Sequence, residues 1–449
     1  MAGVGDVAER LASSRAGAAA RPPRVAIVGG GYAGLAAAVE LAARDIPVTV
    51  FEASRTLGGR ARRVERNGIA LDNGQHILMG AYRETLRLMR RVGLDPDRAL
   101  LRLPLTLVYP GHLRLRAPRL PAPLHLAWAL ATARGAGVGE KLAAMQFMNC
   151  LKAVRFELAR DLSVAELLDD HGQTGMLRQR VWEPLCVAAL NTPAQRASAR
   201  VFMHVMRDTL GGRRAASDLL LPRVDLSRLF PEAAAEFVMR RGGTMRTGMP
   251  ITGIASTSAG FHLRGAPDDA FSHVVLAVGP HQIDKSSAGL AGLEALRRTV
   301  AAFSYEPIVT CYLAYDAAPA LTEPMIGMTG DLTQWLLDRG RLGGPPGLLA
   351  AVISASGRHQ SLPHDQLAVR INAEVAAVVG RPLQPRWTQV IEEKRATFAC
   401  TPDLVRPDSV TPVPNLLVAG DYVASDYPAT LESAVRSGVH CAELIAAQT

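Results

Sequence analysis

The stretch that decides the fold is RVAIVGGGYAGLAAAVELAARDIPVTVFEASRTLGGR, residues 24–60. An apolar run leads into Gly29, Gly31 and Gly34, which stand at the spacing GxGxxG, and a helix-forming run of small residues follows. A second apolar run ends on Glu52. A strand, a glycine turn, a helix and a second strand in this order predict a βαβ unit that binds a dinucleotide.

Each of these residues has a physical task in such a unit. Gly29 permits the tight turn, Gly31 lets the backbone approach a pyrophosphate, and Gly34 lets helix and strand pack closely. The helix N-terminus offers free N–H groups to the phosphates, and Glu52 offers a carboxylate to the ribose hydroxyls. The alternative is a βαβ unit without a ligand, because glycine-rich turns are common. The presence of the strand, the helix, the second strand and the acid together favours a dinucleotide site.

The residues directly after this acid indicate which dinucleotide is bound. Arg55, Gly58, Gly59 and Arg60 form an RxxGGR segment, for which NAD dehydrogenases have no fixed need. The segment resembles the FAD proteins of the amine oxidase and carotenoid desaturase superfamily, in which a second glycine pair lets the chain pass close to the flavin side of the cofactor. The resemblance implies that FAD is the cofactor and that Gly59 and Arg60 contact it.

Length and composition bound the class of protein. With 449 residues the chain is long enough for two domains. Hydrophobic residues make up 48% of it and aromatic residues only 5%, so the apolar content is aliphatic. No run reaches the roughly 18 uninterrupted apolar residues that a membrane-spanning helix needs.

The charge and the cysteines indicate the surroundings of the protein. The net charge is +9, and arginine supplies nearly all of it. Nucleic-acid binding is disfavoured, because no compact basic helix with interleaved aromatic residues occurs. Attraction to an anionic membrane and a genomic bias toward arginine both stay open. The five cysteines are scattered and form no CxxC pair, which indicates a reducing compartment and argues against a zinc site. We expect no metal and a cytoplasmic location, including the inner face of the cytoplasmic membrane.

Residues 120–137, LPAPLHLAWALATARGAG, have an apolar helix at their centre that carries Trp128. The basic residues that flank it are Arg114, Arg116, Arg119, Arg134 and Lys141. An aliphatic helix with an aromatic anchor and basic flanks suits insertion into a membrane interface. The alternative is an ordinary helix that covers a substrate cavity, and the presence of His125 within the helix favours that alternative.

The C-terminal stretch NLLVAGDYVASDYPATLESAVRSGVHCAELI, residues 415–445, repeats the logic of the first motif. A buried strand leads to Gly420 and Asp421, and a helix begins near Thr430. The glycine allows close approach, and Asp421 offers a carboxylate to ribityl or phosphate-linked hydroxyls. The helix N-terminus near Leu431 directs its N–H groups at the flavin pyrimidine edge, which becomes negative on reduction. Opposite ends of the chain are therefore expected to hold one cofactor.

Three further segments make the resemblance more specific: LDNGQHILMGAY (residues 71–82), PLCVAALNTP (184–193) and GDYVASDYPATLESAVRSG (420–438). With them the chain resembles the hydroxysqualene dehydroxylase family, also called squalene-associated FAD-dependent desaturases, from about residue 24 to its end. The resemblance implies that hydroxysqualene loses its hydroxyl and gains a hydride from reduced FAD to give squalene, in bacterial squalene and hopanoid synthesis. It implies a polyprenyl substrate held in an aliphatic tunnel, while the partner that reduces the flavin is unknown.

The same resemblance places residues near the cofactor and the chemistry. In the superfamily residues 74–77 run beside the flavin ring, which implies Gln75 as a cofactor contact, and the backbone at Ile251 frames the adenine. The departing hydroxyl needs a proton or a hydrogen bond as the C–O bond breaks. The candidates for this acid are His76, Asp426, Tyr427 and Glu432. For His76 the alternative is a hydrogen bond to the backbone, and Glu432 has a helix cap or a flavin contact as its alternatives.

We therefore predict an α/β fold with a Rossmann-like FAD-binding domain of the GR2 type, discontinuous in sequence, beside an α+β substrate domain with a helical cap. The FAD-binding parts are expected at residues 24–95, 231–295 and 411–449. The substrate and cap parts are expected at residues 96–230 and 296–410, and residues 1–23 form a flexible leader.

Three rival functions stay open. A carotenoid-type desaturase would run the hydride in the opposite direction, from substrate to oxidised FAD. An amine oxidase is weakened, because no lysine stands where it could reach the flavin N5 through water. The third rival is a non-catalytic FAD-binding scaffold.

Overall fold

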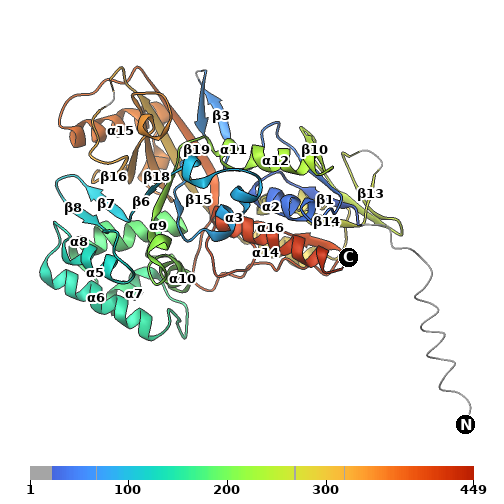
Figure 1. Cartoon of the computed structure of the whole chain (residues 1–449), viewed down its shortest axis with the longest axis horizontal. Helices are drawn as coiled ribbons and strands as arrows, with labels where there is room; N and C mark the ends of the chain where they lie inside the picture. The colour runs from blue at the N-terminus through green and yellow to red at the C-terminus, as the bar shows by residue number, and fades with distance from the viewer. Residues whose placement is uncertain (1–22, 67, 267–268, 318, 449) are drawn as a thin grey trace, which may run out of the picture.

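The computed structural model describes residues 23–66, 68–266, 269–317 and 319–448 (Figure 1). The leader expected over residues 1–23 lies outside the described residues except for its last one. Within the described part of the chain, no helix has both the length and the apolar character needed to cross a membrane.

A five-stranded parallel sheet carries the dinucleotide motif. Its strands, in spatial order, are β10 (Thr244–Thr247), β2 (Val48–Glu52), β1 (Val25–Val28), β14 (His273–Leu276) and β20 (Leu416–Val418). Every residue of β1, β14 and β20 is buried, as expected for parallel strands with both faces covered. The helices around this sheet are α2 (Tyr32–Ala42), α3 (Arg83–Arg91), α12 (Pro231–Arg240) and α16 (Leu431–Ala446). The strands β1 and β20, from opposite ends of the sequence, thus lie in one sheet with only β14 between them.

A second five-stranded sheet is antiparallel and lies beside the first (Figure 1). Its strands, in spatial order, are β16 (Met325–Gly327), β17 (Trp335–Asp338), β18 (Leu348–Ser354), β15 (Tyr305–Ala314) and β19 (Trp387–Phe398). Side chains alternate across it: Val309, Cys311 and Leu313 pack on the side of α15 (His364–Val379). Ile308 and Tyr312 belong to the main core on the other face.

A group of helices forms the end of the molecule farthest from the parallel sheet (Figure 1). These helices are α5 (Leu124–Ala131), α6 (Val138–Ala153), α7 (Val164–Asp170), α8 (Gly175–Leu177), α9 (Glu183–Leu190) and α10 (Ala199–Thr209). Between α8 and α9 the chain makes a π-helical turn at Arg178–Trp182. The hairpin β7 (Thr106–Tyr109) and β8 (Leu113–Arg116) joins this group to the antiparallel sheet, since β7 contacts β16.

Smaller elements connect these parts. The strands are β3 (Arg63–Arg66), β4 (Ile69–Asp72), β5 (Leu78–Met79), β6 (Leu100–Leu103), β9 (Leu219–Pro222), β11 (Ile254–Thr257), β12 (Gly260–Leu263) and β13 (Ala270–Phe271). The helices are α4 (Pro96–Ala99), α11 (Leu226–Leu229), α13 (Ile283–Ser286) and α14 (Glu294–Ala301). The predicted fold class, an α/β dinucleotide-binding domain with an α+β domain and a helical part, is confirmed. The exact domain boundaries stay a prediction.

The last helix closes the dinucleotide domain by packing directly on the first. A Cβ atom on Gly438 of α16 would lie 2.0 Å from the backbone oxygen of Ala33 in α2. Only glycine allows the two helix backbones to come this close. The C-terminal helix is therefore held against the helix that follows the glycine motif.

We predict that Gly438→Ala destabilises the fold, because overpacking of this kind costs about 1–3 kcal/mol. The matched control is Gly139→Ala in α6, where an added Cβ meets no atom within 4 Å. That variant should be neutral or gain up to about 1 kcal/mol from helix propensity. Guanidinium unfolding of both variants measures the difference, and equal midpoints would contradict the packing argument.

Asp72 at the end of β4 is a buried carboxylate that joins three parts of the chain. Its Oδ1 accepts a hydrogen bond from the Leu226 N–H at 2.8 Å, and its Oδ2 lies 3.8 Å from Arg339 Nη2. Burial raises the pKa of Asp72 to about 6, although Arg339 and the Leu226 hydrogen bond act to lower it. The folded state therefore holds a proton that an unfolded aspartic acid releases near pH about 3.9.

This raised pKa predicts that the stability supplied by the Asp72 proton is present at low pH and is lost as the pH rises through about 6. The variant Asp72→Asn cannot ionise at this position. Raising the pH from about 4.5 to about 7 should therefore lower the free energy of unfolding of the wild type, relative to that of the variant, by on the order of 1–3 kcal/mol. Urea unfolding at both pH values measures this difference. The exposed Asp331→Asn serves as the control, and a difference that does not change with pH would contradict the prediction.

Candidate active site

The glycine turn after β1 is shaped by its neighbours. Gly29 has φ +117°, and a Cβ on it would lie 2.3 Å from the Ala277 oxygen. A Cβ on Gly34 would lie 2.0 Å from the Gly29 oxygen. Both positions therefore require glycine for the fold itself, as the sequence predicts for the turn and for the helix contact.

Gly31 differs from these two glycines because the protein leaves open space in front of it. Its φ is −81°, and an added Cβ would meet no protein atom nearer than the Gly59 Cα at 3.8 Å. Gly31 also pairs with Gly58 in an isolated β-bridge, which brings the second glycine pair beside the first motif. No side chain caps α2. The free N–H groups of its first turn and the open space at Gly31 fit a pyrophosphate.

Glu52 is fixed at the end of β2 by two backbone donors. Its carboxylate accepts hydrogen bonds from the Gly30 N–H at 2.7 Å and from the Ser54 N–H at 2.8 Å. The segment after β10 runs alongside, because the Met249 N–H donates to the Glu52 backbone oxygen at 2.9 Å. Ile251 follows in that segment and is buried. The structure therefore brings Glu52 and the Ile251 segment to the same edge of the sheet.

Arg60 and Asp421 join the two ends of the chain. Arg60 Nη2 lies 2.7 Å from both carboxylate oxygens of Asp421, and Arg60 Nη1 donates to the Ala396 oxygen at 2.6 Å. We expected Asp421 to offer its carboxylate to cofactor hydroxyls. The structure pairs that carboxylate with Arg60 first, so each oxygen has only its remaining lone pairs left for a cofactor.

The loop between β20 and α16 is held by hydrogen bonds from Arg406, a residue that the sequence analysis did not identify. Its guanidinium donates to the backbone oxygens of Asp421 at 2.8 Å and Tyr427 at 2.7 Å, and also to those of Tyr422, Val423 and Ser425. At the end of the loop Thr430 caps α16, since its side chain accepts from the Ser433 N–H, and Leu431 is the first helical residue. Gly420 is fixed at the start, where its N–H donates to Ser437 Oγ at 2.8 Å.

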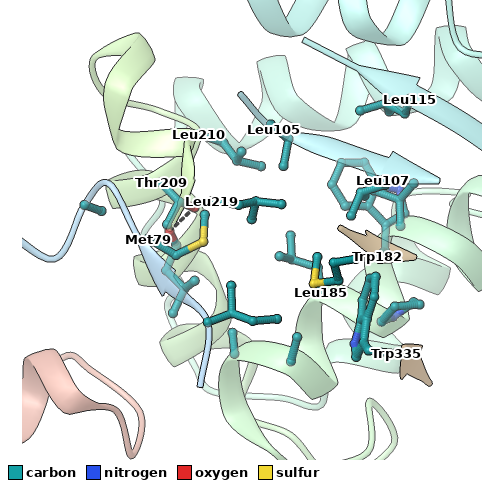
Figure 2. A pocket seen from close by; sticks show the side chains of 18 of the residues that line it. Met79, Leu105, Leu107, Leu115, Trp182, Leu185, Thr209, Leu210, Leu219 and Trp335 are labelled. Atoms are coloured by element: carbon teal, nitrogen blue, oxygen red, sulfur yellow. Dashed lines mark hydrogen bonds between the residues drawn. The ribbon is translucent and has the colours of Figure 1, made fainter. Parts of the chain in front are cut away.

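An apolar cavity of about 250 Å³ lies between the antiparallel sheet and the helical group. Side chains from several elements converge on it, as Figure 2 shows for Met79, Leu107, Leu185 and Trp335. Its wall is almost wholly hydrocarbon. A cavity of this kind takes an apolar ligand and excludes water.

One part of the wall is polar. The polar part is lined by Gln75, Tyr82, Asp208, Tyr427 and Thr430. The Tyr427 hydroxyl donates to Asp208 Oδ2, and Gln75 Nε2 donates to the Tyr312 hydroxyl at 2.7 Å. Since Thr430 caps α16, the polar wall lies at the N-terminus of that helix. The cavity and the candidate cofactor groups therefore meet there.

The charges around Tyr427 and Asp208 keep one protonated and the other ionised. Burial, together with the neighbouring Asp208 carboxylate, raises the pKa of Tyr427 to about 12. Burial also acts to raise the pKa of Asp208, but hydrogen bonds from Tyr427 and Arg207 lower it below its usual value. Arg436 lies over the Tyr427 ring, 4.5 Å from its centroid. The result is a neutral hydroxyl donor beside a carboxylate anion.

Asp208 was missed by the sequence reading. It lies in the last turn of α10, beside Thr209, which also lines the cavity. An acid near a helix C-terminus is unfavourable for the helix dipole. That mismatch was the available signal, although it does not reveal Tyr427 as the partner.

Two of the four candidate acids do not line the cavity for clear structural reasons. Glu432 is fully buried, and its carboxylate accepts from the backbone N–H groups of Glu84 and Thr85, at 3.0 and 2.9 Å, and from Arg436. It therefore caps α3 rather than its own helix, and its role as an acid stays a prediction. The Asp426 side chain is 62% exposed and lies 3.7 Å from His204 Nδ1, so it faces solvent.

His76 is placed differently from its neighbours Gln75 and Ile77, which line the cavity. Its Nδ1 lies 3.0 Å from the Gly74 oxygen, which is the backbone hydrogen bond that the sequence left open as an alternative. Burial lowers the pKa of His76, and nearby Arg60 acts in the same direction. The ring is therefore neutral and gives its one N–H to a carbonyl. Tyr427 is the only one of the four candidates that lines the cavity.

Among the described residues, no group of three or more His, Cys, Asp or Glu side chains is arranged to hold a metal.

Comparisons with known proteins indicate the family of the chain. The family described as flavin containing amine oxidoreductase matches residues 32–446. Hydroxysqualene dehydroxylase of Rhodopseudomonas palustris is 32% identical, over 94% of this chain and 98% of its own. The protein of the same name from Sinorhizobium fredii is 29% identical, over 95% of this chain and 99% of its own. Zeta-carotene desaturase of Solanum lycopersicum is 24% identical, over 92% of this chain and 79% of its own.

Solved structures show the same fold at low identity. Putrescine oxidase with bound putrescine is similar with a TM-score of 0.69 at 18% identity, covering 95% of this chain and 99% of its own. Cyclohexylamine oxidase from Brevibacterium oxydans has a TM-score of 0.68 at 17% identity, with coverage of 95% and 99%. With the family match and the relative at 32% identity, the chain belongs to the hydroxysqualene dehydroxylases, within the FAD-dependent flavin-containing amine oxidoreductases.

Proposed function

We propose that this FAD-dependent oxidoreductase converts hydroxysqualene to squalene. The names of the relatives supply the reaction, and the observation that carries the proposal is an apolar cavity whose polar wall holds Tyr427 and Asp208. A hydrocarbon substrate with a single hydroxyl matches a cavity of this composition. Reduced FAD supplies the hydride, and the hydroxyl leaves as water after gaining a proton.

The residues that hold FAD in this proposal lie around the parallel sheet. Gly31 and the N-terminus of α2 receive the pyrophosphate, Glu52 the ribose, and the backbone at Ile251 the adenine. On the flavin side, the groups are Gly59, Arg60, Gln75, Gly420, Asp421 and the helix N-terminus at Leu431. Those at the start of α16 adjoin the polar wall of the cavity, where Gln75 and Thr430 lie.

The cavity wall has its own part in the chemistry. As the allylic C–O bond breaks, positive charge develops on carbon, and water would capture it. The hydrocarbon wall keeps water away, while the Asp208 carboxylate stabilises positive charge in a low-dielectric space. The Tyr427 hydroxyl gives its single hydrogen to Asp208 in this structure, so in the proposed reaction that O–H turns from Asp208 to the departing oxygen and supplies its proton.

A second candidate function rests on the relatives named zeta-carotene desaturase, which cover 92% of this chain. Such a reaction would take hydride from a polyene to oxidised FAD and would fit the same apolar cavity. The two functions differ in direction. Anaerobic incubation of dithionite-reduced enzyme with hydroxysqualene should give squalene. Failure to form squalene, together with dehydrogenation of squalene or phytoene by oxidised enzyme, would reject the first function in favour of the second.

We predict that Tyr427→Phe and Asp208→Asn each lower kcat for squalene formation by about 10²-fold or more, because each removes one member of the donor pair. The double variant should lose little beyond the worse single variant, since the two groups act together. The control is Tyr315→Phe, whose hydroxyl bonds Asn372 on the opposite face of the antiparallel sheet. Single-turnover oxidation of the reduced flavin measures the rate. Unchanged rates in both single variants would remove the pair from the mechanism.

We further predict that Gly31→Ala leaves the apoprotein folded but weakens FAD binding by about tenfold or more, a loss of about 1.4 kcal/mol. The added methyl meets no protein atom within 3.8 Å, so any loss must come from the space for the pyrophosphate. Titration of the deflavinated protein with FAD measures the affinity, with Gly139→Ala as the control. Undiminished affinity would place the pyrophosphate elsewhere.

A further inference from the structure

The helices α5 and α6 carry an exposed apolar surface at the end of the molecule farthest from the parallel sheet (Figure 1). We call it the α5–α6 face, and it consists of Leu124 and Trp128 on α5, Val138 and Leu142 on α6, and Leu120 in the segment before α5. Leu124 and Trp128 are 58% and 56% exposed, and their spacing of four residues places them on one side of α5. Val138 and Leu142 have the same spacing on α6. Exposed apolar residues gathered on two adjacent helices are typical of a surface that contacts a membrane or another protein.

The segment that carries this face has charges almost entirely of one sign. Residues 111–153 contain one acid, Glu140, whose carboxylate is engaged by the backbone N–H groups of Gly137 and Met176. The lysines and arginines of the same stretch are Arg114, Arg116, Arg119, Arg134, Lys141 and Lys152. Arg114 and Arg116 lie on the exposed side of β8, with Glu323 at 4.0 and 3.9 Å as their nearest acid. An apolar face with a basic border is complementary to a membrane with anionic headgroups.

The inner sides of the same helices line the cavity. Leu126, Ala129 and Leu130 of α5 and Ala144 and Met148 of α6 all contribute to its wall. The exposed apolar side and the cavity-lining side, which match the two interpretations that the sequence left open, therefore lie opposite each other on α5. One helix thickness separates the exposed face from the substrate space.

We propose that the α5–α6 face docks on an anionic lipid bilayer, with Leu124 and Trp128 in the interface and the basic border on the headgroups. This docking does not depend on which substrate the enzyme converts. A second step rests on the proposed function: the apolar substrate enters the cavity from the bilayer past α5 and α6, without crossing water.

The docking is tested by sedimentation of the FAD-loaded enzyme with phosphatidylcholine vesicles, with and without phosphatidylglycerol. The wild type should bind more strongly to the anionic vesicles. Leu124→Ser/Trp128→Ser should lower the bound fraction by about tenfold or more. The control, Val369→Ser/Val405→Ser, removes two apolar side chains that are even more exposed but lie in other regions, and it should bind as the wild type does. Arg116→Glu/Arg119→Glu should lose the preference for anionic vesicles, and added salt should weaken binding of the wild type.

Two results would overturn the docking proposal. One is equal vesicle binding by the wild type and Leu124→Ser/Trp128→Ser. The other is a wild-type dimer in sedimentation velocity that this variant dissociates, without vesicle binding, which would make the face an interface between two copies of the chain.

Substrate entry is tested separately by turnover of hydroxysqualene presented in vesicles or in detergent micelles. The Leu124→Ser/Trp128→Ser variant should be slower only with the vesicles. Turnover in detergent without vesicle binding would reject docking and leave the proposed function in place. Vesicle binding without turnover in either medium would support docking and reject the proposed function. Equal slowing in both media would show that the variant damages the cavity and would reject entry past α5.

Discussion

The loop at residues 421–427 connects the two halves of the site, and Arg406 fixes its shape. One guanidinium donates to five backbone oxygens of this loop, from Asp421 to Tyr427. Asp421 at the start of the loop meets Arg60 of the cofactor side, and Tyr427 at its end meets Asp208 in the cavity. A planar group with five donors suits this task, because it can satisfy several carbonyls without moving. The distance between the cofactor side and the donor pair therefore depends on one partly buried cation.

The proposed reaction would place two opposing demands on the same space. A developing carbocation needs an environment without water, whereas a departing hydroxyl needs a proton. The chain separates these demands: the hydrocarbon wall is supplied by the helical group and the antiparallel sheet, and the polar groups are confined to one wall beside α16. Burial alone would favour a protonated Asp208, but Tyr427 and Arg207 keep its pKa low. The negative charge is thereby retained where positive charge is expected to form.

The sequence predicted what depends on local order and failed where a contact joins distant segments. Strand, glycine turn, helix and acid follow one another within residues 24–60, so spacing alone was sufficient for the dinucleotide unit. The roles of the carboxylates were not accessible in this way. Glu432 caps a helix that begins at Arg83, and Asp208 meets Tyr427 across 219 positions, so neither partner could be read from its neighbours.

The helix α5 shows why one pattern supported two interpretations. In an amphipathic helix, the polar side indicates that the opposite side is buried. Both sides of α5 are apolar, because Leu126 and Leu130 line the cavity while Leu124 and Trp128 are exposed. His125 favoured a helix that simply covers a cavity. It is 1% exposed and bonded to Ser217 at 3.2 Å, so its imidazole belongs to the inner side alone. A histidine on the inner side of α5 does not determine what the outer side contacts. The binding properties of the outer side depend on Trp128 and the basic residues around it.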